Sequence, residues 1–224
     1  MSGGIRVREE RCRGCANCIK SCPTEAIRVI DGVIKIIPEL CIDCGECIRS
    51  CRDKAITVNE DEWELIRSRE GLVLMADPTF YVQVGAYSRP RLMKEALEQH
   101  GLRDIAEYAS IAFDLAAYAS AGIIREGGDN LPYISTYCPA VIRLIQINFP
   151  ELTGRILPVE SPLETAVTIW REATGAKEKV TLVAPCPAKA TLVRNPVGRK
   201  KSSIEYVVSV KRVIRDLLAY NVKV

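Results

Sequence analysis

Apolar residues beyond position 71 follow two alternating patterns. Short continuous apolar runs predict buried strands, whereas apolar residues spaced three or four positions apart predict helices with one buried face. Because the two patterns alternate along the chain, they predict an α/β domain with a mostly parallel sheet. The predicted strands are 72–76, 131–135, 180–184 and 205–208. The predicted helices are 90–100, 114–121, 161–174 and a last one that begins after Ser209.

Start and stop signals support several of these helices. Gly101 and Gly175 are typical helix ends. Ser161, Pro162 and Glu164 have the spacing of a capping box with proline at the first helical position. Two inward faces are expected: Leu92, Met93, Ala96 and Leu97 in the helix over 90–100, and Val213, Ile214, Leu217 and Leu218 in the last helix.

The first 59 residues follow another pattern and contain an internal repeat. Segments 22–27 and 51–56 both read Cys-x-x-x-Ala-Ile. Asp31 and Gly32 predict a hairpin turn that leads into a strand over 33–37. The repeat predicts a small α+β module with two similar halves, each with a β-element and a short helix. We therefore expect three parts: this module over 1–59, a linker with a short helix over 60–71, and the α/β domain over 72–224.

Eight of the ten cysteines form two runs with the same spacing, Cys-x2-Cys-x2-Cys-x3-Cys. This is the ligand pattern of bacterial ferredoxins with two [4Fe–4S] clusters, in which the fourth cysteine of each run binds the other cluster. The N-terminal module is therefore expected to be ferredoxin-like. Disulfides and zinc are the alternatives, and the repeated four-cysteine spacing disfavours both. The predicted ligands are Cys12, Cys15, Cys18 and Cys51 for the first cluster, and Cys41, Cys44, Cys47 and Cys22 for the second.

Composition narrows the class of protein. The chain has 224 residues, of which 48% are hydrophobic and 26% charged, as is typical of a soluble globular protein with one or two domains. No apolar run approaches the roughly 18 residues that span a bilayer, and the N-terminus has no signal-peptide pattern. Oxygen-sensitive clusters then favour a reducing cytoplasm. A net charge of +3 is too small to indicate nucleic acid binding, and the basic stretch 199–201 is expected to be an exposed loop.

The two remaining cysteines share one structural context. Cys138 and Cys186 each follow a predicted strand and precede a proline, which is typical of a helix start. Functional groups of α/β sheets gather beyond the carboxyl ends of the strands, and a helix N-terminus favours a thiolate. The alternative is that both are inert buried thiols. Because the two contexts match, we expect a metal or redox role.

At these residues the chain resembles the catalytic domain of the [FeFe] hydrogenases, over about 72–224. Segment 135–139, Ser-Thr-Tyr-Cys-Pro, is similar to the family motif Thr-Ser-Cys-Cys-Pro, and Phe-Pro-Glu-Leu at 149–152 and Ser-Pro at 161–162 follow it as in the family. Segment 184–189, Ala-Pro-Cys-Pro-Ala-Lys, is similar to the second motif, Met-Pro-Cys-x-x-Lys. In the family, a two-cluster ferredoxin module also precedes this domain.

The resemblance implies roles for a few residues. Cys138 and Cys186 match two of the four thiolates that hold the active-site cubane, and Lys189 matches the lysine that contacts the diiron group. Tyr137 stands where the family has a cysteine that passes protons, and Ala184 replaces a methionine. The third motif, with its Cys-x-x-x-Cys pair, is not reached before the sequence ends at Val224. We therefore expect no hydrogenase activity from this chain alone.

These patterns together predict an electron-transfer protein with two [4Fe–4S] clusters and a hydrogenase-like domain without the diiron site. Cys138 and Cys186, with Lys189 nearby, are expected to bind a third cluster or to mark the docking site of a redox partner. A homodimer that gives two cysteines per chain could complete such a cluster. The alternatives are a subunit of a split hydrogenase or another multi-subunit redox enzyme, whose partner supplies the missing ligands, and a redox sensor.

Overall fold

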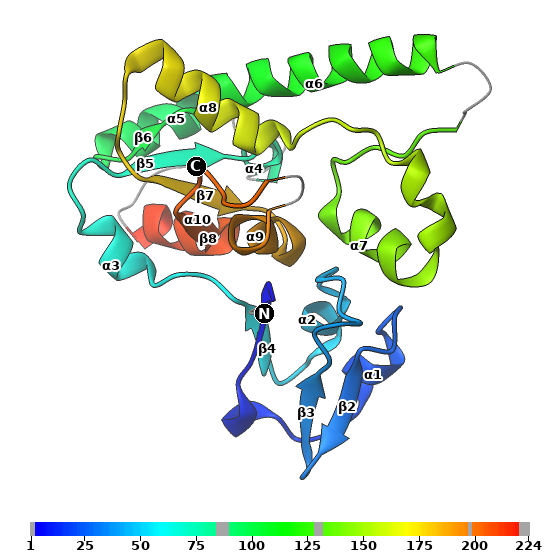
Figure 1. The fold of residues 1–224 in the computed structure, drawn as a ribbon. Coiled ribbons are helices and arrows are strands. Elements are labelled where there is room, and N and C mark those ends of the chain that lie inside the picture. The colour runs from blue at the N-terminus through cyan, green and yellow to red at the C-terminus, as the bar shows by residue number, and fades with distance from the viewer. Residues whose placement is uncertain (1–2, 84–89, 128–131, 197–198, 220–224) are drawn as a thin grey trace.

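A computed structural model of the protein describes residues 3–83, 90–127, 132–196 and 199–219. A small N-terminal module lies against a larger unit with one central sheet, and the helix α7 (Pro139–Asn148) stands beside both (Figure 1). No helix in the described part of the chain is long and apolar enough to cross a membrane.

Two antiparallel strand pairs, a 3-10 turn and two short α-helices make up the N-terminal module. The strand β1 (Ile5–Val7) pairs with β4 (Ile56–Val58), so the two ends of the module lie together. The other pair is β2 (Ile27–Ile30) with β3 (Val33–Ile36). The helices are a 3-10 turn at Glu9–Arg11, α1 (Asn17–Lys20) and α2 (Glu46–Ser50).

The predicted hairpin turn is present between β2 and β3. Asp31 and Gly32 have φ values of 52° and 78°, the left-handed pair that a type I′ turn requires. The predicted strand over 33–37 is observed as Val33–Ile36. Asp31 adopts this conformation at low cost because short polar side chains tolerate it.

The larger unit contains four parallel strands in the order β6-β5-β7-β8, which confirms the predicted α/β class. The strands are β5 (Val73–Ala76), β6 (Arg103–Asp104), β7 (Val180–Ala184) and β8 (Tyr206–Ser209). The helices that precede, connect and follow these strands are α3 (Trp63–Arg67), α4 (Thr79–Gln83), α5 (Pro90–Gln99), α6 (Ala106–Glu126), α7, a 3-10 segment at Pro150–Arg155, α8 (Pro162–Thr174), α9 (Pro187–Arg194) and α10 (Val210–Ala219).

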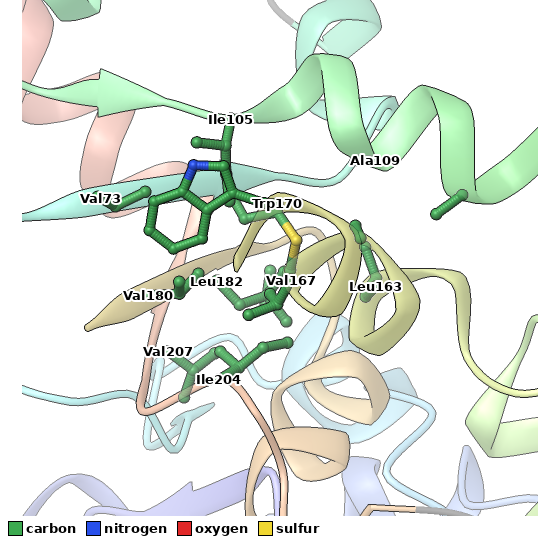
Figure 2. Packing of buried hydrophobic residues seen from close by; sticks show 14 of the residues in the cluster. Val73, Ile105, Ala109, Leu163, Val167, Trp170, Val180, Leu182, Ile204 and Val207 are labelled. Carbon is green, nitrogen blue, oxygen red and sulfur yellow. The ribbon is translucent and has the colours of Figure 1, made fainter. Parts of the chain in front are cut away.

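Helices cover both faces of this sheet. Val73 and Met75 of β5 pack on the side of α6 and α8, where Trp170 is completely buried (Figure 2). Leu74 and Ala76 alternate to the other side, against α5 and α10. Because β5 and β7 are buried on both faces, their residues are apolar without alternation, apart from the buried Thr181 in β7.

Three local predictions are wrong. The segment 131–135 is not a sheet strand: Leu131 lies outside the described residues, and only Ile134 forms a bridge, with Ile156. Leu218 is 53% exposed because it lies to the side of the stripe of Val213 and Leu217 on α10. The capping box at α8 does not form, since Ser161 makes no side-chain cap hydrogen bond.

Glu164 has another role instead. It is 2% exposed and accepts hydrogen bonds from the backbone N–H of Ser203 at 2.8 Å, from Ser202, and from Arg199 at 2.9 Å. The basic stretch is therefore only partly an exposed loop, because Arg199 is held by a buried carboxylate while Lys200 and Lys201 are exposed.

Candidate metal centres

The first group of cysteines surrounds one cavity. Cys12, Cys15, Cys18 and Cys51 all line it, although Cys51 is far from the other three in the sequence. Cys18 is buried on α1 and Cys15 is exposed at the rim. This is the set of four that the sequence pattern assigns to the first cluster.

The second group consists of Cys22, Cys41, Cys44 and Cys47. The thiol of Cys22 interacts electrostatically with each of the other three, so the fourth cysteine of the first run lies with the second run. Burial, followed by neighbouring thiols, raises the pKa of Cys47 to about 12. Burial also raises the pKa of Cys41 to about 12; the backbone N–H of Asp43 opposes this effect and the Asp43 carboxylate adds to it.

Backbone N–H groups point at sulfur in both halves of the repeat. Ala26 N–H donates to Cys22 Sγ at 3.3 Å, and Ala55 N–H donates to Cys51 Sγ at 3.3 Å. Ala26 and Ala55 are both 1% exposed. The repeated Cys-x-x-x-Ala-Ile segment therefore gives a buried N–H donor to Cys22 and to Cys51, each of which lies with the cysteines of the other run.

The donor set fits an iron–sulfur cluster. Neutral thiols with raised pKa values become thiolates when a metal supplies the compensating positive charge. Among the described residues, no three His, Cys, Asp or Glu side chains gather closely enough to hold a single metal ion. The first group of thiols lines a cavity, which is the arrangement that an extended cluster requires.

The loop of the second group is fastened to the larger unit. Asp43 is 5% exposed and accepts hydrogen bonds from Gly4 N–H at 3.1 Å and from Thr191 Oγ1 of α9 at 2.8 Å. A Cβ at Gly4 would lie 2.2 Å from the carbonyl oxygen of Pro187, so only glycine allows this approach. The two units therefore meet beside Cys41 and Cys44.

Cys138 and Cys186 lie at the starts of two neighbouring helices. Each occupies the N-cap position of a helix, Cys138 before α7 and Cys186 before α9, and both are half-buried. The two thiols interact electrostatically. Burial raises the pKa of the Cys186 thiol, and the nearby Lys189 ammonium partly opposes that effect.

Lys189 also lies at this site, but it is already paired. Its ammonium forms a buried ion pair with Asp77, which is 0% exposed, and it stands 3.9 Å from the centroid of the Tyr137 ring. Sequence reasoning missed Asp77. Its position directly after the buried strand β5, at the carboxyl edge of the parallel sheet, was the available signal.

A cleft connects the second cysteine group with this site. Its lining includes Cys44 and Gly45 on one side and Cys186 and Pro187 on the other. A Cβ at Gly45 would lie 3.3 Å from the Pro187 ring. The chain therefore brings the second thiol group and the thiol at α9 to one shared opening.

Comparison with known families agrees with this architecture. The family described as "Iron only hydrogenase large subunit, C-terminal domain" matches residues 70–223, and the "4Fe-4S dicluster domain" matches residues 4–59. The chain therefore belongs to the iron-only hydrogenase large-subunit family and also carries an iron–sulfur dicluster domain. No curated protein matches the chain.

A solved structure supports the fold. It is described as "Stepwise [FeFe]-hydrogenase H-cluster assembly revealed in the structure of HydA(deltaEFG)", and its TM-score is 0.50 at 14% sequence identity. The match covers 68% of this chain and 42% of that chain. At this identity the likeness shows a shared fold.

Proposed function

We propose that the protein is an electron-transfer protein whose N-terminal module, residues 1–59, holds two [4Fe–4S] clusters. The observation that carries this proposal is the crossed grouping of the eight thiols, in which Cys51 joins the first run and Cys22 joins the second. When bound, each cluster supplies reversible exchange of one electron. In this division, residues 60–71 are the linker and residues 72–224 are the hydrogenase-like domain.

The residues of the module have two tasks toward such clusters. The thiols, of which Cys18 and Cys47 are buried, would hold them as thiolates, and the N–H groups of Ala26 and Ala55 donate to the ligand sulfurs. Hydrogen bonds to sulfur and solvent exposure set cluster potentials. Cys15 and Cys44 are the exposed ligands and so form the solvent-facing edges of the two sites.

We propose that Cys138 and Cys186 form a further site, for a third cluster or for a docked redox partner. Two thiols leave two positions of a cubane unfilled, so a second copy of the chain or another subunit would complete it. The ion pair of Lys189 with Asp77 supports the proposal that no diiron group is bound here, since the ammonium already has a buried partner. This chain alone is then expected to have no hydrogenase activity.

Iron and sulfide counts on anaerobically purified protein test this proposal. About eight irons per chain correspond to the two N-terminal clusters, about ten to a third cluster shared in a dimer, and about twelve to a third cluster in each chain. Cys138→Ser and Cys186→Ser lower the count only in the last two cases. A count that stays well below eight after reconstitution would refute the two-cluster proposal.

A second candidate is a subunit of a larger redox enzyme. The observation that favours it is that Cys138 and Cys186, two neighbouring thiols at helix starts, supply only part of a cubane's ligands, which another subunit would complete. Hydrogen evolution from reduced viologen separates the candidates. We expect none from the purified chain, and activity that arises only when a second subunit is added would favour the enzyme subunit.

A further inference from the structure

Arg143 places a positive charge beside the loop of the second cysteine group. It lies on α7, the helix that begins at Cys138, and its side chain is half-buried. Its Nε donates to the carbonyl oxygen of Cys41 at 2.8 Å, and a terminal guanidinium nitrogen donates to the carbonyl oxygen of Pro38 at 2.9 Å. The larger unit therefore contributes a cation to a site whose thiols all belong to the N-terminal module.

The chemistry of these contacts distinguishes Arg143 from other arginines near the thiols. Both hydrogen bonds go to neutral carbonyl groups, so they fix the guanidinium without neutralising it. Arg49, two residues after Cys47, is instead bonded to the Glu46 carboxylate at 2.7 Å, with a side chain that is 81% exposed. A half-buried charge is screened less by water than an exposed, paired one.

We propose that Arg143 sets the reduction potential of the cluster held by Cys22, Cys41, Cys44 and Cys47, so that the hydrogenase-like domain controls a redox property of the N-terminal module. The inference rests on the proposed function, because it requires a cluster at these four thiols. Reduction adds one negative charge to the cluster, and a nearby cation stabilises that charge. Arg143 thus raises the potential, and its removal lowers it.

The test is an anaerobic redox titration of the full chain followed by electron paramagnetic resonance. Arg143→Gln keeps hydrogen-bonding groups but removes the charge, and Arg143→Met fills the space without donors. We expect both to lower the equilibrium constant for reduction of the second cluster by about threefold to tenfold, where tenfold equals about 59 mV for one electron. Arg143→Lys should recover most of the shift, because it restores the charge. Cys15→Ser changes only the first site, so the paramagnetic resonance signal that it alters belongs to the first cluster and the other signal to the second.

Controls separate this inference from the proposed function. Arg49→Gln is the matched control and should leave the second potential unchanged, and the first cluster should be unaffected by every Arg143 variant. A wild-type count far below about eight irons would defeat the proposed function itself. With full iron, an unchanged potential in Arg143→Gln, or an equal shift in Arg143→Lys, would overturn the role of Arg143. A neutral variant that lost its second cluster would also overturn it, because Arg143 would then build the site rather than tune it.

Discussion

Lys189 and Asp77 form a buried ion pair although 112 positions separate them in the sequence. The pair joins the first turn of α9 to the end of β5, and the ring of Tyr137 covers the ammonium. It therefore fixes the helix that carries Cys186 to the centre of the sheet.

Removing one partner of this pair should destabilise the protein strongly. Asp77→Ala leaves the Lys189 ammonium buried without its counter-ion, which typically costs about 3–5 kcal/mol. The double variant Asp77→Leu/Lys189→Met should recover most of that loss, because no charge remains buried. Anaerobic urea unfolding, followed by fluorescence of the buried tryptophans, measures both. A double variant as unstable as the single one would contradict this account.

Glu164 should matter far more than its neighbour Glu160. Glu164 is buried and holds Arg199, Ser202 and the Ser203 backbone, whereas Glu160 bonds to Arg199 with a side chain that is 40% exposed. We expect Glu164→Ala to cost about 2–4 kcal/mol, because it leaves several half-buried donors without their shared acceptor, and Glu160→Ala less than about 1 kcal/mol. Trypsin should also cut faster at Lys200 and Lys201 in Glu164→Ala. Equal cleavage in the two variants would count against this role.

Asp104 should make stability depend on pH. Burial, reinforced by the nearby Glu107 carboxylate, raises the pKa of Asp104 to about 7. The folded protein then binds more protons than the unfolded chain between pH 4 and 7, so the free energy of unfolding falls as pH rises, by up to about 1.4 kcal/mol per pH unit. Asp104→Asn removes this slope.

Urea unfolding of wild type and Asp104→Asn at pH 5 and pH 8 checks the sign. The free energy of unfolding of the variant minus that of wild type should be larger at pH 8 than at pH 5, because at pH 8 the buried aspartate of wild type would be charged. The same difference at both values would mean that Asp104 keeps an ordinary pKa.

Iron removal should unfold the N-terminal module before the sheet. The buried apolar cluster of the module consists of Cys18, Ile27, Ile34, Cys47 and Ile56, so two of its five members are cysteines. So small a core depends on metal as a cross-link, while the larger unit has two apolar clusters of its own. Chelation under acid, followed by limited trypsin digestion at neutral pH, should cut residues 3–59 first. A digestion pattern unchanged by iron loss would refute this dependence.

The elements that the sequence predicted are those with strong local patterns. Val180–Ala184 is apolar apart from Thr181, and Asp31-Gly32 is a turn signal in which both residues adopt the conformation expected. The strand Arg103–Asp104 has only two residues and no apolar pattern, so nothing in the sequence marks it. Segment 131–135 has apolar residues like a strand, but of its described residues, 132–135, only Ile134 forms a bridge.

The candidate site also has features that the sequence predicted and contacts that it did not. Ligand spacing within each cysteine run predicted the crossed grouping, which stays a prediction as a ligand set until iron is measured. The contacts of Arg143 with Cys41 and of Thr191 with Asp43 span 102 and 148 positions. Such contacts depend on how the two units pack, which no local pattern encodes.

The close contact between Gly4 and Pro187 can form only late in synthesis of the chain. The two strands that close the N-terminal module, β1 and β4, have both left the ribosome once residue 58 has emerged. The α9 helix that covers Gly4 and Asp43 follows much later, by roughly 10 s at ordinary translation rates. During that interval one side of the loop with Cys41 and Cys44 faces solvent, and we expect iron delivery to be easiest then, before α9 closes over it.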